Sequence, residues 1–433
     1  MVTAGSGSSD ARAPRPGRRI DEALYLALVA LLPLHTVYFR AWIAWKPWLV
    51  LLVVLAGTQV WQGVRARSSP WERTLTIPIA VFLLAMAASW PGGSDSRFAR
   101  LFLALVIGAL LLLVSRRMLS RQGMLDRVLR AVYWSAAAMA ATAVLLSMVA
   151  VGVFGAGAAD SIADLPLIER VVKVAYLREG FVGLTNWHQD PGYAAAWMNL
   201  WAAIAFLAVR RGLGSGRVAI DALVVGGLWL GVFMTLSRTG LLGMGVGIVT
   251  VLWTERREIR PALLLAAVSA AAAVALAGTV WLLDPPDIGG DIGEAVEFRI
   301  RQGFSLGPGD SGGEAPGVLD LEYRGEVWPI YWDYFLDDPL RGAGLGTGWA
   351  AEGVQEPHNL LLQLIGETGV VGLAGFVVLF VAIVRSARNR IGVAALIVAL
   401  SGSITQTVLF EATWWFAAAL ALAPRSPPIL TEA

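Results

Sequence analysis

The sequence predicts an all-α integral membrane protein with about twelve transmembrane helices, and three observations lead to this fold class. The chain of 433 residues is 57% hydrophobic and only 15% charged, which is too apolar for an ordinary soluble domain. Apolar segments of about 20 residues, the length that crosses roughly 30 Å of hydrocarbon, recur along nearly the whole chain. Arginine clusters fall in every second connection between these segments, as expected of cytoplasmic loops.

The apolar segments define the predicted spans, and the basic clusters define their orientation. The spans are 20–38, 44–62, 74–90, 98–115, 128–154, 191–209, 218–236, 239–254, 261–283, 357–384, 391–407 and 411–424. The clusters lie within 12–19, 65–73, 116–130, 210–217, 256–260 and 385–390, and at 425. Because these clusters occupy alternate connections, both termini are predicted to be cytoplasmic.

The spans and their connections divide the chain into seven parts. These are a disordered cytoplasmic tail (1–19), helices one to five (20–154), an outer loop (155–190), helices six to nine (191–283), a large outer loop (284–356), helices ten to twelve (357–424) and a cytoplasmic tail (425–433). A loop as long as 284–356 between membrane helices is usually functional, with a tolerated insertion as the alternative.

Charge and cysteine content exclude several classes of function. The formal net charge is only +2, so no basic patch for nucleic acid is expected. The chain has no cysteine, which excludes disulfides, thiolate metal sites and cysteine nucleophiles. No spacing of His, Asp and Glu is typical of a metal site. We therefore expect membrane lipids around the protein, and no nucleic acid, metal or cofactor.

The large outer loop carries fifteen acidic residues against four arginines, so its cations are candidates for binding an anionic substrate. Arg301, Arg324 and Arg341 belong to this group. From Glu322 to Asp338, aromatic residues that include Trp328 recur at helical spacing. This pattern predicts an interfacial helix, because Trp and Tyr favour the headgroup zone. Ordinary packing of an outer helix explains the pattern equally well.

His358 follows Pro357 where the large loop meets the next apolar helix. Proline suits a first helical turn, so His358 and Asn359 are expected at the outer mouth of that helix. An imidazole is well suited to accept a proton near neutral pH, which makes His358 a candidate general base. Capping or packing is the alternative for a lone histidine at a helix start.

Arg238 lies in a tight predicted turn between two spans. Only 38 residues separate Arg217 from Arg256, and they must cross the membrane twice. Arg238 is therefore expected at or slightly below the outer interface. A guanidinium there can bind phosphate oxygens in bidentate fashion, or it can anchor the helix to lipid headgroups.

The shorter of the two long outer loops, residues 155–190, adds two weaker candidates, Arg178 and His188. His188 stands just before Asp190 and Pro191, which a helix cap and first turn explain without any function. In the large loop, glycines alternate at 342, 344, 346 and 348. Such a run can bring backbone N–H groups to phosphates, but no Rossmann unit surrounds it, so a turn is favoured.

The order of these motifs resembles the O-antigen ligase and polymerase superfamily. The resemblance rests on Ser237-Arg238-Thr239-Gly240, on Arg324 with Trp328 four residues later, on Asp338-Pro339-Leu340-Arg341-Gly342-Ala343-Gly344, on His358-Asn359, and on Glu367-Thr368-Gly369-Val370-Val371-Gly372. It covers about half of the chain, from residue 180 to residue 385. Where the family has a short Pro-Asn element, this chain has His188-Gln189-Asp190-Pro191-Gly192, so no role is carried over there.

The resemblance implies a membrane-embedded glycosyltransferase with a GT-C-like architecture in the bacterial inner membrane. Family members transfer glycans from undecaprenyl pyrophosphate on the periplasmic face. His358 matches the family's essential histidine, the proposed base, and Arg238 and Arg324 match arginines that bind the donor pyrophosphate. Arg178, His188, Arg301, Arg341 and Asn359 are further candidates for substrate binding.

The acceptor remains open among three classes. A ligase uses lipid A core, a polymerase uses a second lipid-linked glycan, and a protein glycosylase uses a protein side chain. We favour a lipid A core ligase, because the chain shows no added soluble domain for a protein acceptor. A lipid or polysaccharide transporter is the alternative from another class, although no paired repeat with broken helices is apparent.

Overall fold

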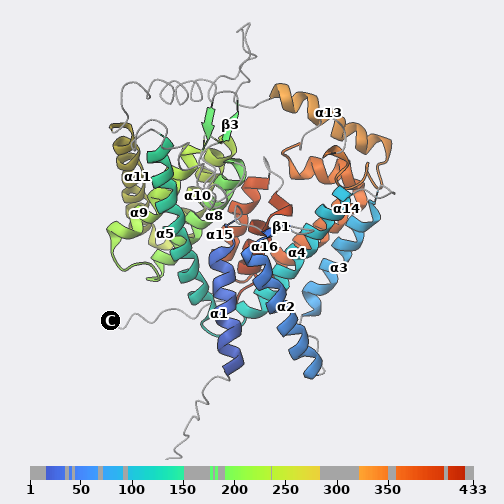
Figure 1. Cartoon of the computed structure of the whole chain (residues 1–433), viewed down its shortest axis with the longest axis horizontal. Helices are drawn as coiled ribbons and strands as arrows, with labels where there is room; N and C mark the ends of the chain where they lie inside the picture. The colour runs from blue at the N-terminus through green and yellow to red at the C-terminus, as the bar shows by residue number, and fades with distance from the viewer. Residues whose placement is uncertain are drawn as a thin grey trace, which may run out of the picture.

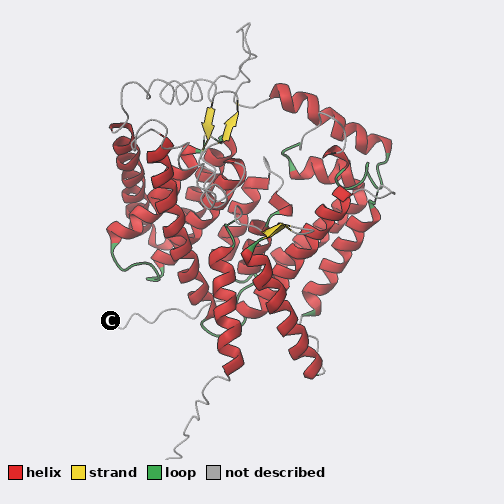
Figure 2. Ribbon diagram, viewed as in Figure 1, coloured by secondary structure: helices red, strands yellow, loops and turns green. Residues whose placement is uncertain are grey.

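The computed structural model describes residues 16–34, 39–40, 44–66, 72–90, 96–150, 176–178, 181–183, 191–235, 237–282, 321–349, 357–403 and 408–424 (Figures 1 and 2). Its α-helices are α1 (Pro16–Leu31), α2 (Pro47–Arg65), α3 (Arg73–Ala88), α4 (Ser96–Leu119), α5 (Met124–Ala150), α8 (Pro191–Arg210), α9 (Val218–Met234), α10 (Arg238–Thr254), α11 (Ile259–Leu282), α13 (Leu321–Asp337), α14 (Leu360–Ser386), α15 (Arg390–Ser403) and α16 (Ala412–Ala421). Short 3-10 turns are η1 (Arg256–Glu258), η2 (Thr347–Trp349) and η3 (Val408–Phe410). Two antiparallel hairpins pair β1 (Phe39–Arg40) with β2 (Ala44–Trp45), and β3 (Tyr176–Arg178) with β4 (Phe181–Gly183).

The helical prediction is confirmed, since each predicted span falls on a helix. Within the described residues, α2, α4, α5, α8, α11 and α14 are long and apolar enough to cross a membrane. The helices α3, α9, α10, α15 and α16 are apolar but shorter. These features fit a multi-pass integral membrane protein. The helix predicted from the aromatic spacing in the large loop is also present, as α13.

The helices pack in two groups around a common centre (Figure 1). On one side α5, α8, α9, α10 and α11 pack on one another, and on the other α14 packs along α3 and carries α13. The helices α15 and α16 lie between the groups, where the Trp201 and Phe416 rings meet at a centroid distance of 5.7 Å. Nearly all of α8 and α16 is buried, so these helices form the core.

Ion pairs join helix ends within the basic clusters that predicted the cytoplasmic face. Arg127 pairs with Glu22 at 2.7 Å, and Arg121 pairs with Asp21 at 3.4 Å, which ties α1 to the start of α5. Arg210 at the end of α8 pairs with Glu258 in η1 at 2.7 Å. These clusters therefore hold helices together.

The tenth predicted span, 357–384, was expected to be one continuous helix, and the structure corrects this. α14 is broken at Gly369, whose backbone (φ 57°, ψ −162°) is not helical. Two backbone N–H groups beyond the break, those of Val370 and Val371, donate to the carbonyl oxygens of Pro339 and Leu340. The loop after α13 thus supplies the acceptors that the broken helix lacks.

The second span also begins later than expected, because β2 occupies Ala44–Trp45 and α2 starts at Pro47. Proline fits the first turn of a helix and cannot donate within it, so it sets this start. The hairpins at residues 39–45 and 176–183 were not predicted. Residues 16–19, expected in the first disordered tail, belong to α1, so this helix begins earlier than predicted. The rest of the expected tails (1–15 and 425–433) and most of both outer loops lie outside the described residues.

Replacing Gly369 by alanine should destabilise the protein. A Cβ at this position would lie 2.5 Å from the carbonyl carbon of Leu340, in a backbone conformation that L-residues rarely adopt. We expect a loss of more than about 1 kcal/mol, measured as a lower thermal midpoint in detergent or nanodiscs. Gly245→Ala is the matched control, since nothing lies within 4 Å of a Cβ there and its helix should tolerate alanine. Equal midpoints for the two variants would contradict the assigned break.

Candidate functional site

The helix α13 is fixed against the start of α14 by one side-chain hydrogen bond and by close backbone packing. The indole Nε1 of Trp328 donates to the carbonyl oxygen of Pro357 at 3.0 Å. Tyr331 is fully buried, and a Cβ on Gly366 would lie only 2.5 Å from its carbonyl oxygen. The two helices therefore form one unit, which we call the outer platform (residues 321–349 and 357–369).

His358 occupies a strained backbone position on the outer platform. It is the one non-glycine residue with positive φ (47°) in the described part of the chain. A left-handed conformation costs an L-residue roughly 1–2 kcal/mol, so the surrounding contacts must hold it in place. The Trp328 hydrogen bond fixes the carbonyl before His358, and the cap of α14 fixes the residue after it. Strain of this kind is typical of functional sites.

Asn359 caps α14, because its side-chain oxygen accepts a hydrogen bond from the backbone N–H of Leu362 at 3.1 Å. The sequence prediction considered this residue for substrate binding. The structure gives it a structural role next to His358, and substrate contact stays a prediction.

Arg324 lies four residues before Trp328 in α13. Four residues make about one helical turn, or roughly 6 Å along the axis, so Arg324 lies about one turn along α13 from the residue that contacts Pro357. This juxtaposition of α13 with residues 357–358 is shown by the Trp328 hydrogen bond. The structure does not describe the position of the Arg324 side chain.

Arg238 is the first residue of α10, in a turn built by several polar contacts. The Ser237 side chain accepts from the Gly240 N–H at 3.1 Å, and Asn199 of α8 donates to the Gly240 carbonyl at 2.9 Å. These bonds fix the helix start that carries Arg238. α10 packs chiefly on α8 and α15, whereas α13 packs on α14, so the packing does not join Arg238 to the outer platform.

The glycine run at 342–348 forms a turn docked on the break in α14. The N–H groups of Ala343 and Gly344 donate to the carbonyls of Gly366 and Glu367, and that of Gly346 donates to the Glu367 carboxylate at 3.0 Å. Because these N–H donors bond to groups of the protein itself, the structure supports the interpretation of the glycine run as a turn and not as a phosphate-binding loop. Burial, followed by the charge of Glu367, raises the pKa of the nearby Tyr334.

Two arginines lie next to this turn, one that was predicted as a candidate and one that was not. Arg341 was predicted and is exposed, with its backbone N–H bonded to Asp338. Arg97 at the start of α4 was missed, although a Cβ on Gly346 would come within 3.4 Å of it. A basic residue between spans three and four breaks the alternation of basic loops, and this signal was present in the sequence.

The remaining candidates are not joined to the platform by any described contact. Arg178 lies in β3, and its side chain is not described. His188 and Arg301 lie outside the described residues. Within the part of the chain that the structure describes, no group of three or more His, Asp or Glu side chains could hold a metal ion.

The fold and this platform define a multi-pass α-helical membrane protein with polar residues at helix starts. Residues 222–377 match the family model described as O-Antigen ligase, and this match supports the resemblance to the O-antigen ligase and polymerase superfamily. Arg238, Arg324 and His358 all lie inside the matched segment. No curated protein and no solved structure matches the chain.

Trp328→Phe should disturb His358 without unfolding the protein. The change keeps an aromatic side chain but removes the indole N–H that donates to the Pro357 carbonyl. Such a hydrogen bond contributes about 0.5–1.5 kcal/mol. We expect a small loss of thermal stability and a larger loss of kcat in glycan transfer. Trp332→Phe on the same helix is the control, because Trp332 is 49% exposed. If both variants kept wild-type kcat, Trp328 would not position His358.

Proposed function

We propose that this protein is an O-antigen ligase, which transfers a glycan from undecaprenyl pyrophosphate to a sugar hydroxyl of lipid A core. The proposal includes a twelve-span, GT-C-like fold in the bacterial inner membrane, cytoplasmic termini and a site facing the periplasm. The description of the matched family supports ligation. A polymerase or a protein glycosylase of the same superfamily is the alternative.

The chemistry needs a base on the acceptor and positive charge on the leaving group. The acceptor oxygen attacks the anomeric carbon, and His358 takes the hydroxyl proton. The bond from this carbon to the phosphate oxygen breaks, and its electron pair leaves on the pyrophosphate. Arg238 and Arg324 stabilise that charge through bidentate hydrogen bonds. These cations can serve without a metal, so we expect full activity with a chelator present; loss restored by divalent ion would refute this.

The observation that carries the proposal is the strained, anchored position of His358 beside the helix of Arg324. A residue with φ 47°, held by bonds on both sides at the mouth of α14, is poised as a positioned base would be. A histidine that only capped the helix would not need this arrangement, because Asn359 already supplies the cap.

His358→Ala should abolish transfer in liposomes that contain a lipid-pyrophosphate-linked glycan and lipid A core. Removal of a general base lowers rates by about 10² to 10⁴-fold. Gel separation of products compares the variant with wild type, and Trp332→Phe is the control, because Trp332 is exposed on α13 and has no proposed role in transfer.

The products of wild type distinguish the acceptor classes. Glycan on lipid A core establishes a ligase, and lengthened donor chains establish a polymerase. If His358→Ala keeps wild-type rates, the proposed base is wrong. If uptake of lipid-linked glycan occurs with no product, the protein is a transporter.

A further inference from the structure

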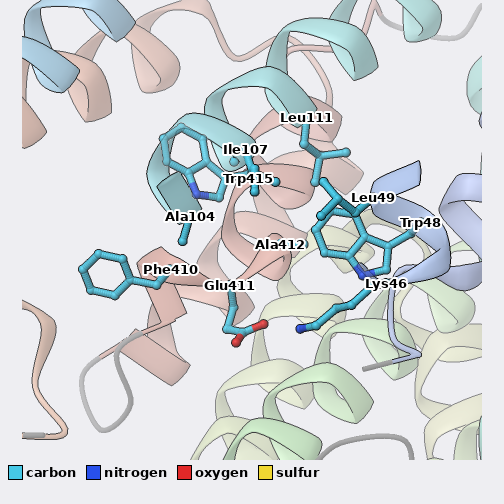
Figure 3. Close-up of a pocket in the computed structure, with 11 residues that line it drawn as sticks. Lys46, Trp48, Leu49, Ala104, Ile107, Leu111, Phe410, Glu411, Ala412 and Trp415 are labelled. Atoms are coloured by element: carbon cyan, nitrogen blue, oxygen red, sulfur yellow. The ribbon is translucent and has the colours of Figure 1, made fainter. Parts of the chain in front are cut away.

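Lys46 and Glu411 face each other across a cavity between α2, α4 and α16 (Figure 3). The cavity has a volume of about 120 Å³. A water needs roughly 10–15 Å³ of such space, so the cavity is several times larger than a water site. Apart from these two charged side chains, its walls are apolar, and they include the aromatic rings of Trp48, Phe410 and Trp415.

The cavity lies deep in the membrane-spanning part of the protein. Its α4 wall runs from Ala104 to Leu111, which are each about 12 Å from the nearer end of that helix. Lys46 and Glu411 nevertheless stand just before α2 and α16, each at the end of a loop that the distribution of arginine clusters assigns to the outer side. A charged pair at this depth is costly unless it serves a cavity or a function.

The pair is not explained by helix capping. Glu411 stands at the N-cap of α16, but its side chain accepts no capping hydrogen bond from that helix. Its carboxylate points toward the Lys46 ammonium (Figure 3).

The aromatic wall is rigid. The indole Nε1 of Trp415 donates to the Leu409 carbonyl at 2.8 Å, which fixes this ring. A Cβ on Gly108 would overlap the same ring, so glycine is what lets it lie against α4. The cavity is therefore preformed, as small-ligand sites usually are.

The chemistry of the lining selects the class of ligand. An anion would have to separate Lys46 from Glu411 and leave a carboxylate beside it, and an apolar ligand would leave both charges unsolvated. A neutral hydroxyl group avoids both costs. An ammonium has three donors and a carboxylate about four acceptor positions, so both can bind hydroxyls while they continue to face each other. Aromatic faces fit the C–H faces of a sugar ring.

We propose that this cavity is a subsite for one neutral sugar ring of the glycan substrate, with Lys46 donating to and Glu411 accepting from its hydroxyls. The proposal rests on the proposed function, because it assigns the cavity to a glycan that enters from the outer side. It adds a recognition site outside the segment matched by the family model.

Ala104→Leu tests the proposal by filling the cavity without changing a charge. A larger side chain in a packing void usually stabilises a protein, whereas in a subsite it excludes the ligand. We expect KM for the lipid-linked glycan or the lipid A core to rise roughly tenfold, because a change of this size corresponds to the loss of one hydrogen bond to a charged group. The kcat should stay within about twofold of wild type. Ala99→Leu, exposed on the same helix, is the matched control.

A charge exchange separates ligand binding from structure. Lys46→Glu combined with Glu411→Lys keeps two opposite charges at the cavity but swaps donor and acceptor, so KM should again rise while the thermal midpoint stays near wild type. Unchanged KM in both the exchange and Ala104→Leu would overturn the proposal and leave the two charged side chains with a structural role only.

A binding readout keeps this test independent of the proposed function. Methyl glucoside, methyl galactoside and N-acetylglucosamine are added to wild type and Ala104→Leu in nanodiscs. We expect at least one sugar to raise the thermal midpoint of wild type only. If wild type transfers no glycan, the ligase proposal fails, and this shift alone decides the subsite: no shift with any sugar overturns it.

Discussion

The break in α14 at Gly369 is the constraint on which the outer part of the structure depends. A continuous helix would leave no backbone donors for the loop after α13 and no room for its close approach. With the break, Val370 and Val371 bond to Pro339 and Leu340, and the loop docks against buried Glu367. Docking of this loop brings α13 over the start of α14, where Trp328 reaches the carbonyl before His358. The strained histidine is thus held by contacts that depend on a break eleven residues further along the chain.

This arrangement explains two of the motifs in physical terms. Asp338-Pro339-Leu340-Arg341-Gly342-Ala343-Gly344 and Glu367-Thr368-Gly369 face each other. Gly342 and Gly369 are needed because a Cβ on either would meet the backbone of the other segment. Their role is to build the platform, while the proposed chemistry belongs to the charged residues at its edges. Arg238 stands apart on α10, in a turn fixed by Ser237 and Asn199.

Sequence reasoning found the elements whose signals are local. Apolar length located the spans, and aromatic spacing located α13. It missed the break at Gly369, because a glycine in an apolar helix has the same local pattern whether the helix continues or bends. It could not pair Lys46 with Glu411, since residues far apart in the chain meet only after the helices pack. It placed Asn359 beside His358 but could not separate capping from substrate contact.

The proposed mechanism requires that Arg238 and Arg324, on separately packed helices, bind one pyrophosphate beside His358. A double-mutant cycle on donor-lipid affinity with Arg238→Lys, Arg324→Lys and the double variant tests it most directly, because lysine keeps the charge and loses the bidentate fork. A shared donor site predicts a coupling free energy of about 0.5–3 kcal/mol between the two substitutions, as for groups that share a partner. Effects that add within about 0.3–0.5 kcal/mol would mean that the arginines act independently, and would contradict a shared donor site.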